Sequence, residues 1–181
     1  MIKQVLFIQG AGEGAYGEDE ALAENLRQQL GRDYDVRYPR MPNEADPDDE
    51  AWGKVITDEI ADMGDDAILV AHSAGAVTLT LILARGLLTQ KIAGVFLIGA
   101  PFFGDGGWRV EGFEIPKDFG KRLPDAPLFL YHGTGDETAP IAHLDLYARA
   151  IPHAVVRRLE GRNHQLNDDL SEVADDIKRF A

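Results

Sequence analysis

The feature that most constrains the fold is a run of five apolar residues, 67–71, that leads into a long apolar segment. The run reads Ala-Ile-Leu-Val-Ala and is apolar on both faces, which is typical of a parallel strand buried inside a sheet. Residues 74–88 are apolar nearly all round and predict a buried helix. Together they predict an α/β fold in which helices cover both faces of a central sheet.

Shorter apolar runs alternate with helical patterns along the rest of the chain. The predicted strands are residues 5–8, 36–38, 67–71, 94–98, 128–132 and 155–159, and the predicted helices are residues 18–30, 52–63, 74–88, 141–150 and 168–180. This alternation predicts about six parallel strands in a three-layer α/β/α sandwich. The 181 residues contain no repeat or low-complexity linker, so we expect a single domain over residues 1–181.

Charge and residue content narrow the classes of function. Acidic residues outnumber basic ones 31 to 18, and the resulting net charge of −13 disfavours nucleic acid and anionic membranes as partners. The chain has no cysteine, so a covalent mechanism has to rest on Ser, Thr, Asp or Lys. The first apolar run is too short for a signal peptide, and no stretch is long enough to span a membrane. We therefore expect a cytoplasmic protein.

The segment Ala71-His72-Ser73-Ala74-Gly75 lies between the predicted buried strand and the buried helix. A sharp strand–turn–helix exposes a serine hydroxyl above the sheet and needs small residues two positions before and after the serine. Ala71 and Gly75 are small, although glycine is usual at both positions. The alternative is a structural serine that caps the helix. The flanking apolar elements favour a nucleophile, and His72 is expected to be structural because adjacent side chains on such a turn diverge.

An activated serine needs a general base and an acid that orients the base. On this type of sheet they follow the serine in the order acid, then histidine. His164 comes after the last predicted strand and is the predicted base, the alternative being a surface histidine. Asp136 follows the fifth strand in a glycine-containing turn and is the predicted acid, although such an Asp can also be a turn residue.

Other residues could compete for these roles. Glu137 and Asp105 are competing carboxylates. The other histidines are expected to be structural or exposed: His132, His143 and His153.

The tetrahedral intermediate of acyl transfer needs two preorganised N–H donors. We expect one from Ala74, at the start of a helix, and the other from Ala11, in the glycine-rich loop after the first strand. A glycine-rich loop in this position can also bind a dinucleotide. Residues 12–17 match G-x-G-x-x-G, but the full loop does not open directly into the helix, and no Asp or Glu closes the second strand. We therefore predict no cofactor and no metal.

Aromatic residues gather between the fourth and fifth predicted strands. Phe102, Phe103 and Trp108 are predicted to line a modest apolar pocket over the serine, with Phe113 and Phe119 nearby. The alternative is that these rings close the edge of the core. The segment is too short for a large lid, so we expect small acyl groups to be preferred.

With these motifs the chain resembles the α/β-hydrolase-fold serine hydrolases over nearly its full length, and more narrowly the small YdeN-type serine hydrolases. The narrower match rests on Pro-Arg-Met-Pro at 39–42, Trp52, Ala-His-Ser-Ala-Gly at 71–75, Asp136 and His164. The resemblance implies a Ser–Asp–His triad, no cofactor and a minimal α/β-hydrolase fold without a large lid. The chain departs from that pattern at three positions. Ala71 stands where Gly is usual, Gln9 where many relatives have His, and Asn163 where Gly often precedes the catalytic histidine. Gln9 affects the expected shape of the oxyanion loop, which is the glycine-rich loop after the first strand.

We therefore expect a carboxylesterase-like serine hydrolase that cleaves a small ester, thioester or amide through an acyl-enzyme on Ser73. Two other classes stay open: a hydrolase-fold binding protein with an idle triad, and a small-molecule lyase or cofactor-free peroxidase that uses the same triad. The expected partner is a small-molecule substrate, and the sequence leaves a homo-oligomer open.

Overall fold

The computed structural model describes residues 2–109 and 115–181 of the chain. The strands are β1 (Lys3–Ile8), β2 (Tyr34–Arg37), β3 (Ala67–His72), β4 (Ile92–Ile98), β5 (Leu128–Gly133) and β6 (Val155–Leu159). The helices are α1 (Ala15–Leu30), α2 (Asp49–Met63), α3 (Ser73–Ala84), α4 (Ala142–Ala150) and α5 (Ser171–Phe180), and two 3-10 turns are η1 (Phe119–Lys121) and η2 (Leu166–Asp168).

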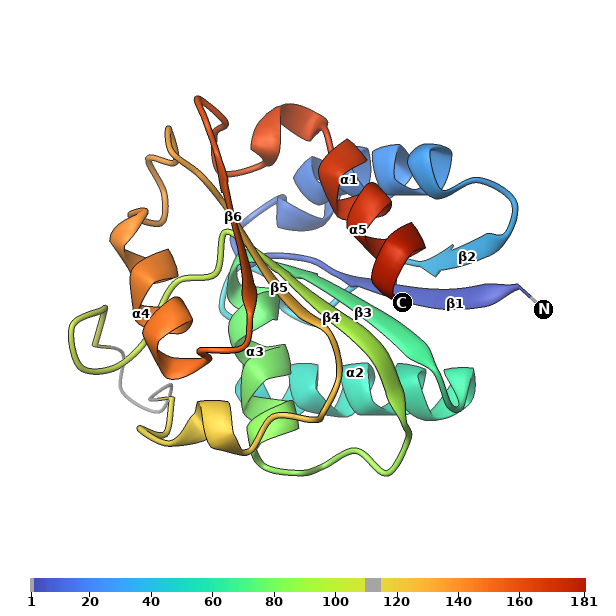
Figure 1. The fold of residues 1–181 in the computed structure, drawn as a ribbon, viewed down its shortest axis with the longest axis horizontal. Coiled ribbons are helices and arrows are strands. Elements are labelled where there is room, and N and C mark those ends of the chain that lie inside the picture. The colour runs from blue at the N-terminus through green and yellow to red at the C-terminus, as the bar shows by residue number, and fades with distance from the viewer. Residues whose placement is uncertain (1, 110–114) are drawn as a thin grey trace.

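The described strands form one six-stranded parallel sheet in the order β2-β1-β3-β4-β5-β6. Helices α1 and α5 lie on one face of the sheet, while α2 and α3 lie on the other (Figure 1). This arrangement confirms the predicted three-layer sandwich. The strand order reverses between β1 and β3, so the chain leaves these two strands toward opposite faces of the sheet, to α1 and to α3. Ligands of such sheets bind at the carboxyl ends of these two strands.

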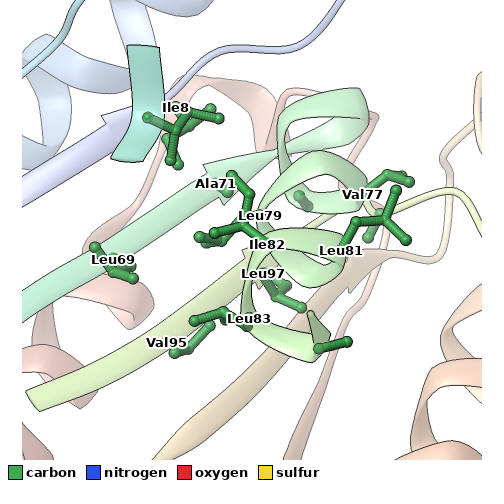
Figure 2. Packing of buried hydrophobic residues seen from close by; sticks show 14 of the residues in the cluster. Ile8, Leu69, Ala71, Val77, Leu79, Leu81, Ile82, Leu83, Val95 and Leu97 are labelled. Atoms are coloured by element: carbon green, nitrogen blue, oxygen red, sulfur yellow. The ribbon is translucent and has the colours of Figure 1, made fainter. Parts of the chain in front are cut away.

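The central strand and helix are buried as the sequence predicts. All six residues of β3 are buried, and α3 is buried from Gly75 to its last residue. Figure 2 shows Leu69 and Ala71 of β3 packed with Leu79 of α3, together with side chains from β4. Complete burial of one such leucine is worth about 2 kcal/mol. The elements that carry the candidate site are therefore held rigidly.

Four predicted helix ends are wrong by three residues or more. Helices α1 and α2 begin at Ala15 and Asp49, before the predicted starts at residues 18 and 52. Helix α3 ends at Ala84, before residue 88, because the Leu87 N–H bonds back to the carbonyl of Ile82 at 3.3 Å around Gly86, whose φ of 66° is left-handed. This pairing is a glycine-containing helix stop. Helix α5 begins at Ser171, after residue 168, because residues 166–168 all have left-handed backbone that cannot start a right-handed helix.

Candidate active site

Ser73 stands at the sharp turn between β3 and α3. Its φ of 52° is left-handed, a conformation that costs a non-glycine residue about 1 kcal/mol and is found at functional turns. The turn is tight, since a Cβ atom at Gly75 would lie 2.2 Å from the carbonyl oxygen of Gln9. The predicted strand–turn–helix is confirmed, and Ser73 is left half-buried at its apex.

The structure brings the three predicted triad residues into one hydrogen-bonded chain. The Ser73 Oγ lies 2.9 Å from His164 Nε2, and His164 Nδ1 lies 2.7 Å from Asp136 Oδ2. The three side chains come from the loops after β3, β6 and β5. Only 8% of the His164 side chain is exposed and none of the Asp136 side chain, so water competes little for these bonds.

The Asp136 carboxylate is both a turn residue and the partner of His164. Its Oδ1 accepts hydrogen bonds from the main-chain N–H groups of Thr138 and Ala139, both at 2.8 Å. Its Oδ2 also lies 3.1 Å from Nε2 of the buried His132. Burial alone would raise the pKa of Asp136, but bonds from His132, His164 and Ala139 outweigh it and hold the pKa well below its usual range.

These contacts determine which nitrogen of His164 carries the proton. An ionised carboxylate can only accept, so Nδ1, which faces Asp136, must donate. In the neutral ring Nε2 is then the acceptor, and the Ser73 hydroxyl donates to it. This is the tautomer that a general base needs to take a proton from serine.

The competing carboxylates lie elsewhere. Asp105 is exposed and pairs with Lys117 at 2.8 Å and with Arg109 at 3.7 Å. The hydrogen bond from Lys117 lowers the pKa of Asp105. Glu137 is exposed beside the turn. Within the described residues, the carboxylate that bonds to the His164 ring is that of Asp136.

The two predicted oxyanion donors flank the serine. Ala74 is the second residue of α3, so its N–H precedes the hydrogen-bond ladder of the helix. Ala11 follows Gly10, whose backbone lies against the serine: a Cβ atom at Gly10 would come within 3.0 Å of the Ser73 Cβ. Ala11 and Ala74 are both half-buried.

A buried glutamine and a glutamate hold the loop that contains Ala11. Gln9 is fully buried; its amide nitrogen donates to Glu44 at 2.9 Å, and its oxygen accepts from the Met41 N–H at 2.9 Å. Glu44 also accepts from the N–H groups of Gly14 and Tyr16 at the start of α1. Glu44 therefore anchors this loop, a role that its place in an acidic stretch of sequence did not reveal.

The aromatic residues predicted to line a substrate pocket divide into two groups. The Phe102 ring packs against the rings of Tyr147 and Phe119, which fits the alternative that it closes the edge of the core. Phe103 and Trp108 lie with ring centroids 6.0 Å apart, and Trp108 stays 40% exposed over His143. Trp108 is thus accessible to a ligand; Phe113 lies outside the described residues.

His72, the residue before Ser73, links a second carboxylate, that of Asp19, to the site. His72 is buried, with Nδ1 at 2.8 Å from Asp19 Oδ2 and Nε2 at 3.1 Å from the main-chain oxygen of His164. The same Asp19 oxygen accepts from the Gly10 N–H at 2.7 Å. His72 points away from the Ser73 hydroxyl, as expected, but Asp19 was not identified from the sequence, where it is one acidic residue among several in a helix.

The described residues contain neither a metal-binding cluster nor a membrane-spanning helix. No group of three or more His, Asp or Glu side chains in ranges 2–109 and 115–181 is placed to hold a metal ion. In the same ranges, no helix has the length and apolar character needed to cross a membrane.

Comparison with known proteins gives a family match over most of the chain and similar folds over nearly all of it. Residues 19–156 match a family described as serine hydrolase. A serine hydrolase involved in carbazole degradation has a similar structure, with a TM-score of 0.76 and 16% identity over 98% of this chain and 90% of the relative. The esterase PE8 (TM-score 0.72, 16% identity, 99% and 93%) and SOBER1 from Arabidopsis thaliana (0.70, 14%, 98% and 98%) are also similar. No curated protein matches by sequence.

Proposed function

The chain belongs to the serine hydrolase family, and we propose that it is a carboxylesterase-like enzyme that cleaves small esters, or related thioesters or amides, through an acyl-enzyme on Ser73. The observation that carries this proposal is the unbroken hydrogen-bonded chain from the Ser73 hydroxyl through His164 to Asp136. Each link has the length and the proton position that nucleophilic catalysis by serine requires.

In the first half of the reaction, Ser73 Oγ attacks the carbonyl carbon of the substrate while its proton moves to His164 Nε2. The positive charge that forms on the imidazole is stabilised by the ionised Asp136 carboxylate, which four donors keep in place. The carbonyl oxygen becomes an oxyanion, for which the N–H groups of Ala11 and Ala74 are the proposed donors. His164 then gives its proton to the leaving alcohol, and the acyl group stays on Ser73.

In the second half, water replaces the alcohol. His164 Nε2 takes a proton from the water molecule, whose oxygen attacks the acyl carbon. The second oxyanion collapses, the acid leaves, and the proton returns to Ser73 Oγ. The same residues thus serve both halves, and their chemistry calls for no added redox or group-transfer reagent.

Ester cleavage is the first reaction to test, since the structurally similar PE8 is named as an esterase. The exposed Trp108 ring is the proposed contact for the acyl or alcohol group, with Phe103 beside it. Phe102 would act by supporting these two rings, because its own ring is packed against Tyr147.

The proposal is tested with a fluorophosphonate probe and a panel of p-nitrophenyl esters. The wild-type protein should gain one covalent adduct on Ser73, and Ser73→Ala should gain none. Hydrolysis by Ser73→Ala should fall by about 10⁶-fold, which is the scale seen when the nucleophile of a serine hydrolase is removed. A folded wild-type protein that is neither labelled nor active on any ester would contradict the proposal and favour a binding protein that retains the fold.

A further inference from the structure

A pair of buried ionisable side chains lies beside the proposed triad and takes no part in the mechanism above. Asp19 of α1 and His72 at the end of β3 each have only 2% of their side chain exposed. Removing two ionisable groups from water is costly unless they are well bonded. A pair this deeply buried at the site therefore calls for an explanation beyond general stability.

The bonds of the pair reach three of the four segments that build the site. Asp19 Oδ2 accepts from the N–H of Gly10, the residue before the proposed oxyanion donor Ala11. His72 is itself the residue before Ser73. Its Nε2 bonds to the main-chain oxygen of His164, and the two histidine rings lie with centroids 4.7 Å apart.

The proton positions follow from the partners. A carbonyl oxygen can only accept, so His72 Nε2, which faces the His164 carbonyl, carries a proton. Asp19 Oδ2 already accepts from Gly10, and His72 Nδ1 is placed to be its second donor. Burial alone would lower the pKa of His72, but the Asp19 carboxylate and the His164 carbonyl outweigh it and raise the pKa. Both ring nitrogens thus face acceptors, the carboxylate of Asp19 and the carbonyl of His164.

We infer that Asp19 and His72 are positioning residues, which hold the oxyanion loop at Gly10 and the main chain of His164 in register with Ser73 without touching the substrate. The inference rests on the proposed function. Its chemical basis is that the far nitrogen of His72 faces a carbonyl, which has no proton to give, so the pair can orient the base but cannot itself activate a nucleophile. The bond from His72 to the His164 main-chain oxygen joins the bonds between Asn163 and Asn167 that hold this loop.

Two substitutions of His72 separate its two bonds. The amide nitrogen of asparagine takes the place of Nδ1, so His72→Asn keeps a donor to Asp19 and releases the His164 carbonyl. The amide nitrogen of glutamine takes the place of Nε2, so His72→Gln keeps the donor to His164 and releases Asp19. Displacing a catalytic group by about 1 Å can cost about 10²-fold in rate. We expect His72→Asn to lose about 10²-fold in kcat with little change in KM, and His72→Gln to retain about tenfold more kcat than His72→Asn.

A third substitution tests the carboxylate. In Asp19→Asn one oxygen becomes an NH₂ group, and the remaining oxygen cannot satisfy both Gly10 and a neutral His72 that still donates to His164. We expect about a tenfold or greater loss in kcat. The matched control is Asp176→Asn, since Asp176 is also a buried carboxylate, bonded to Tyr131 and Arg157 away from the site. The control should lose stability but keep kcat.

The measurements are ester hydrolysis, the rate of fluorophosphonate labelling, and thermal unfolding of each variant. The low-field ¹H NMR signal of the His164 Nδ1 proton is recorded as well; it should shift in His72→Asn and stay in place in Asp176→Asn. Equal kcat in His72→Asn, His72→Gln and the wild type would overturn the positioning role while leaving the proposed function intact. An inactive wild type would overturn both. If Asp19→Asn does not fold, the two His72 variants decide.

Discussion

The Asp136–His164 and Asp19–His72 pairs lie next to each other and have nearly the same carboxylate–imidazole distance, 2.7 Å and 2.8 Å. They differ in what the far nitrogen of the imidazole meets. His164 Nε2 faces the hydroxyl of Ser73, whereas His72 Nε2 faces a main-chain carbonyl. A hydroxyl can give up a proton and a carbonyl cannot. A short bond between an acid and a histidine is therefore no sign of catalysis by itself; the group beyond the histidine decides whether the pair reacts or positions.

The sharpest test of this difference removes the charge of Asp136 from the Asp136–His164 pair. Asp136→Asn should lower kcat by about 10⁴-fold, because the amide can no longer fix the tautomer of His164 or stabilise its imidazolium. Asp105→Asn is the matched control and should leave kcat unchanged, since Asp105 is exposed and bonded to Lys117. Ester hydrolysis and thermal unfolding are measured for both variants. The reverse ranking, with both proteins folded, would transfer the acid role to Asp105.

A second test concerns the histidine behind Asp136. His132 Nε2 lies 2.8 Å from the carbonyl oxygen of Ala139 and 3.1 Å from the carboxylate of Asp136. His132→Asn removes a donor at that position, while His132→Gln keeps one. We expect about a tenfold loss of kcat in the first variant and a smaller loss in the second, on the scale of one hydrogen bond to a charged group. Equal losses in both would show that His132 acts through packing alone.

The aromatic rings predicted to line the substrate pocket also predict a preference for short acyl chains. Burial of one methylene is worth about 0.8 kcal/mol, or about fourfold in kcat/KM. Phe102 is packed into the core edge and Trp108 is exposed, so these rings offer little enclosed surface to a long acyl chain. Across p-nitrophenyl esters of increasing length, kcat/KM should stop rising after a few carbons. A steady increase to long chains would contradict this expectation and point to a groove beyond these rings.

The smallest expected effect is on how the free energy of unfolding depends on pH. The pKa of the Asp136 carboxyl is held below its usual value, so the unfolded chain binds that proton at higher pH than the folded protein does. The stability contributed by these bonds is therefore fully present above about pH 3.9, the usual pKa of Asp, and is lost as the pH falls further. Urea unfolding should show a stability gap between wild type and Asp136→Asn that is constant above about pH 4 and narrows below it. A gap that does not narrow would contradict the assignment.

Much of the site could be predicted from the sequence because its residues follow strands. Parallel strands place all their carboxyl ends on one edge of the sheet, so Ser73, Asp136 and His164 are brought together by the order of the elements alone. The aromatic segment was less predictable: a run containing Phe102 and Trp108 looks the same whether a ring packs inward or stays exposed. The end of α3 had a usable signal in Gly86, and the helix prediction passed over it.

The sequence by itself therefore determined the sandwich, the turn at Ser73 and the chain order of the three proposed triad residues, because these depend on hydrophobic pattern and on local backbone geometry. Tertiary structure alone decided the contacts of Asp19 and Glu44. In the sequence both are acidic residues in or next to acidic segments, where solvated side chains are the rule. Asp19 reaches His72 across 53 positions and Glu44 reaches Gln9 across 35. Whether such a carboxylate is buried and bonded depends on which distant loops the folded sheet brings over it, and no local pattern records that.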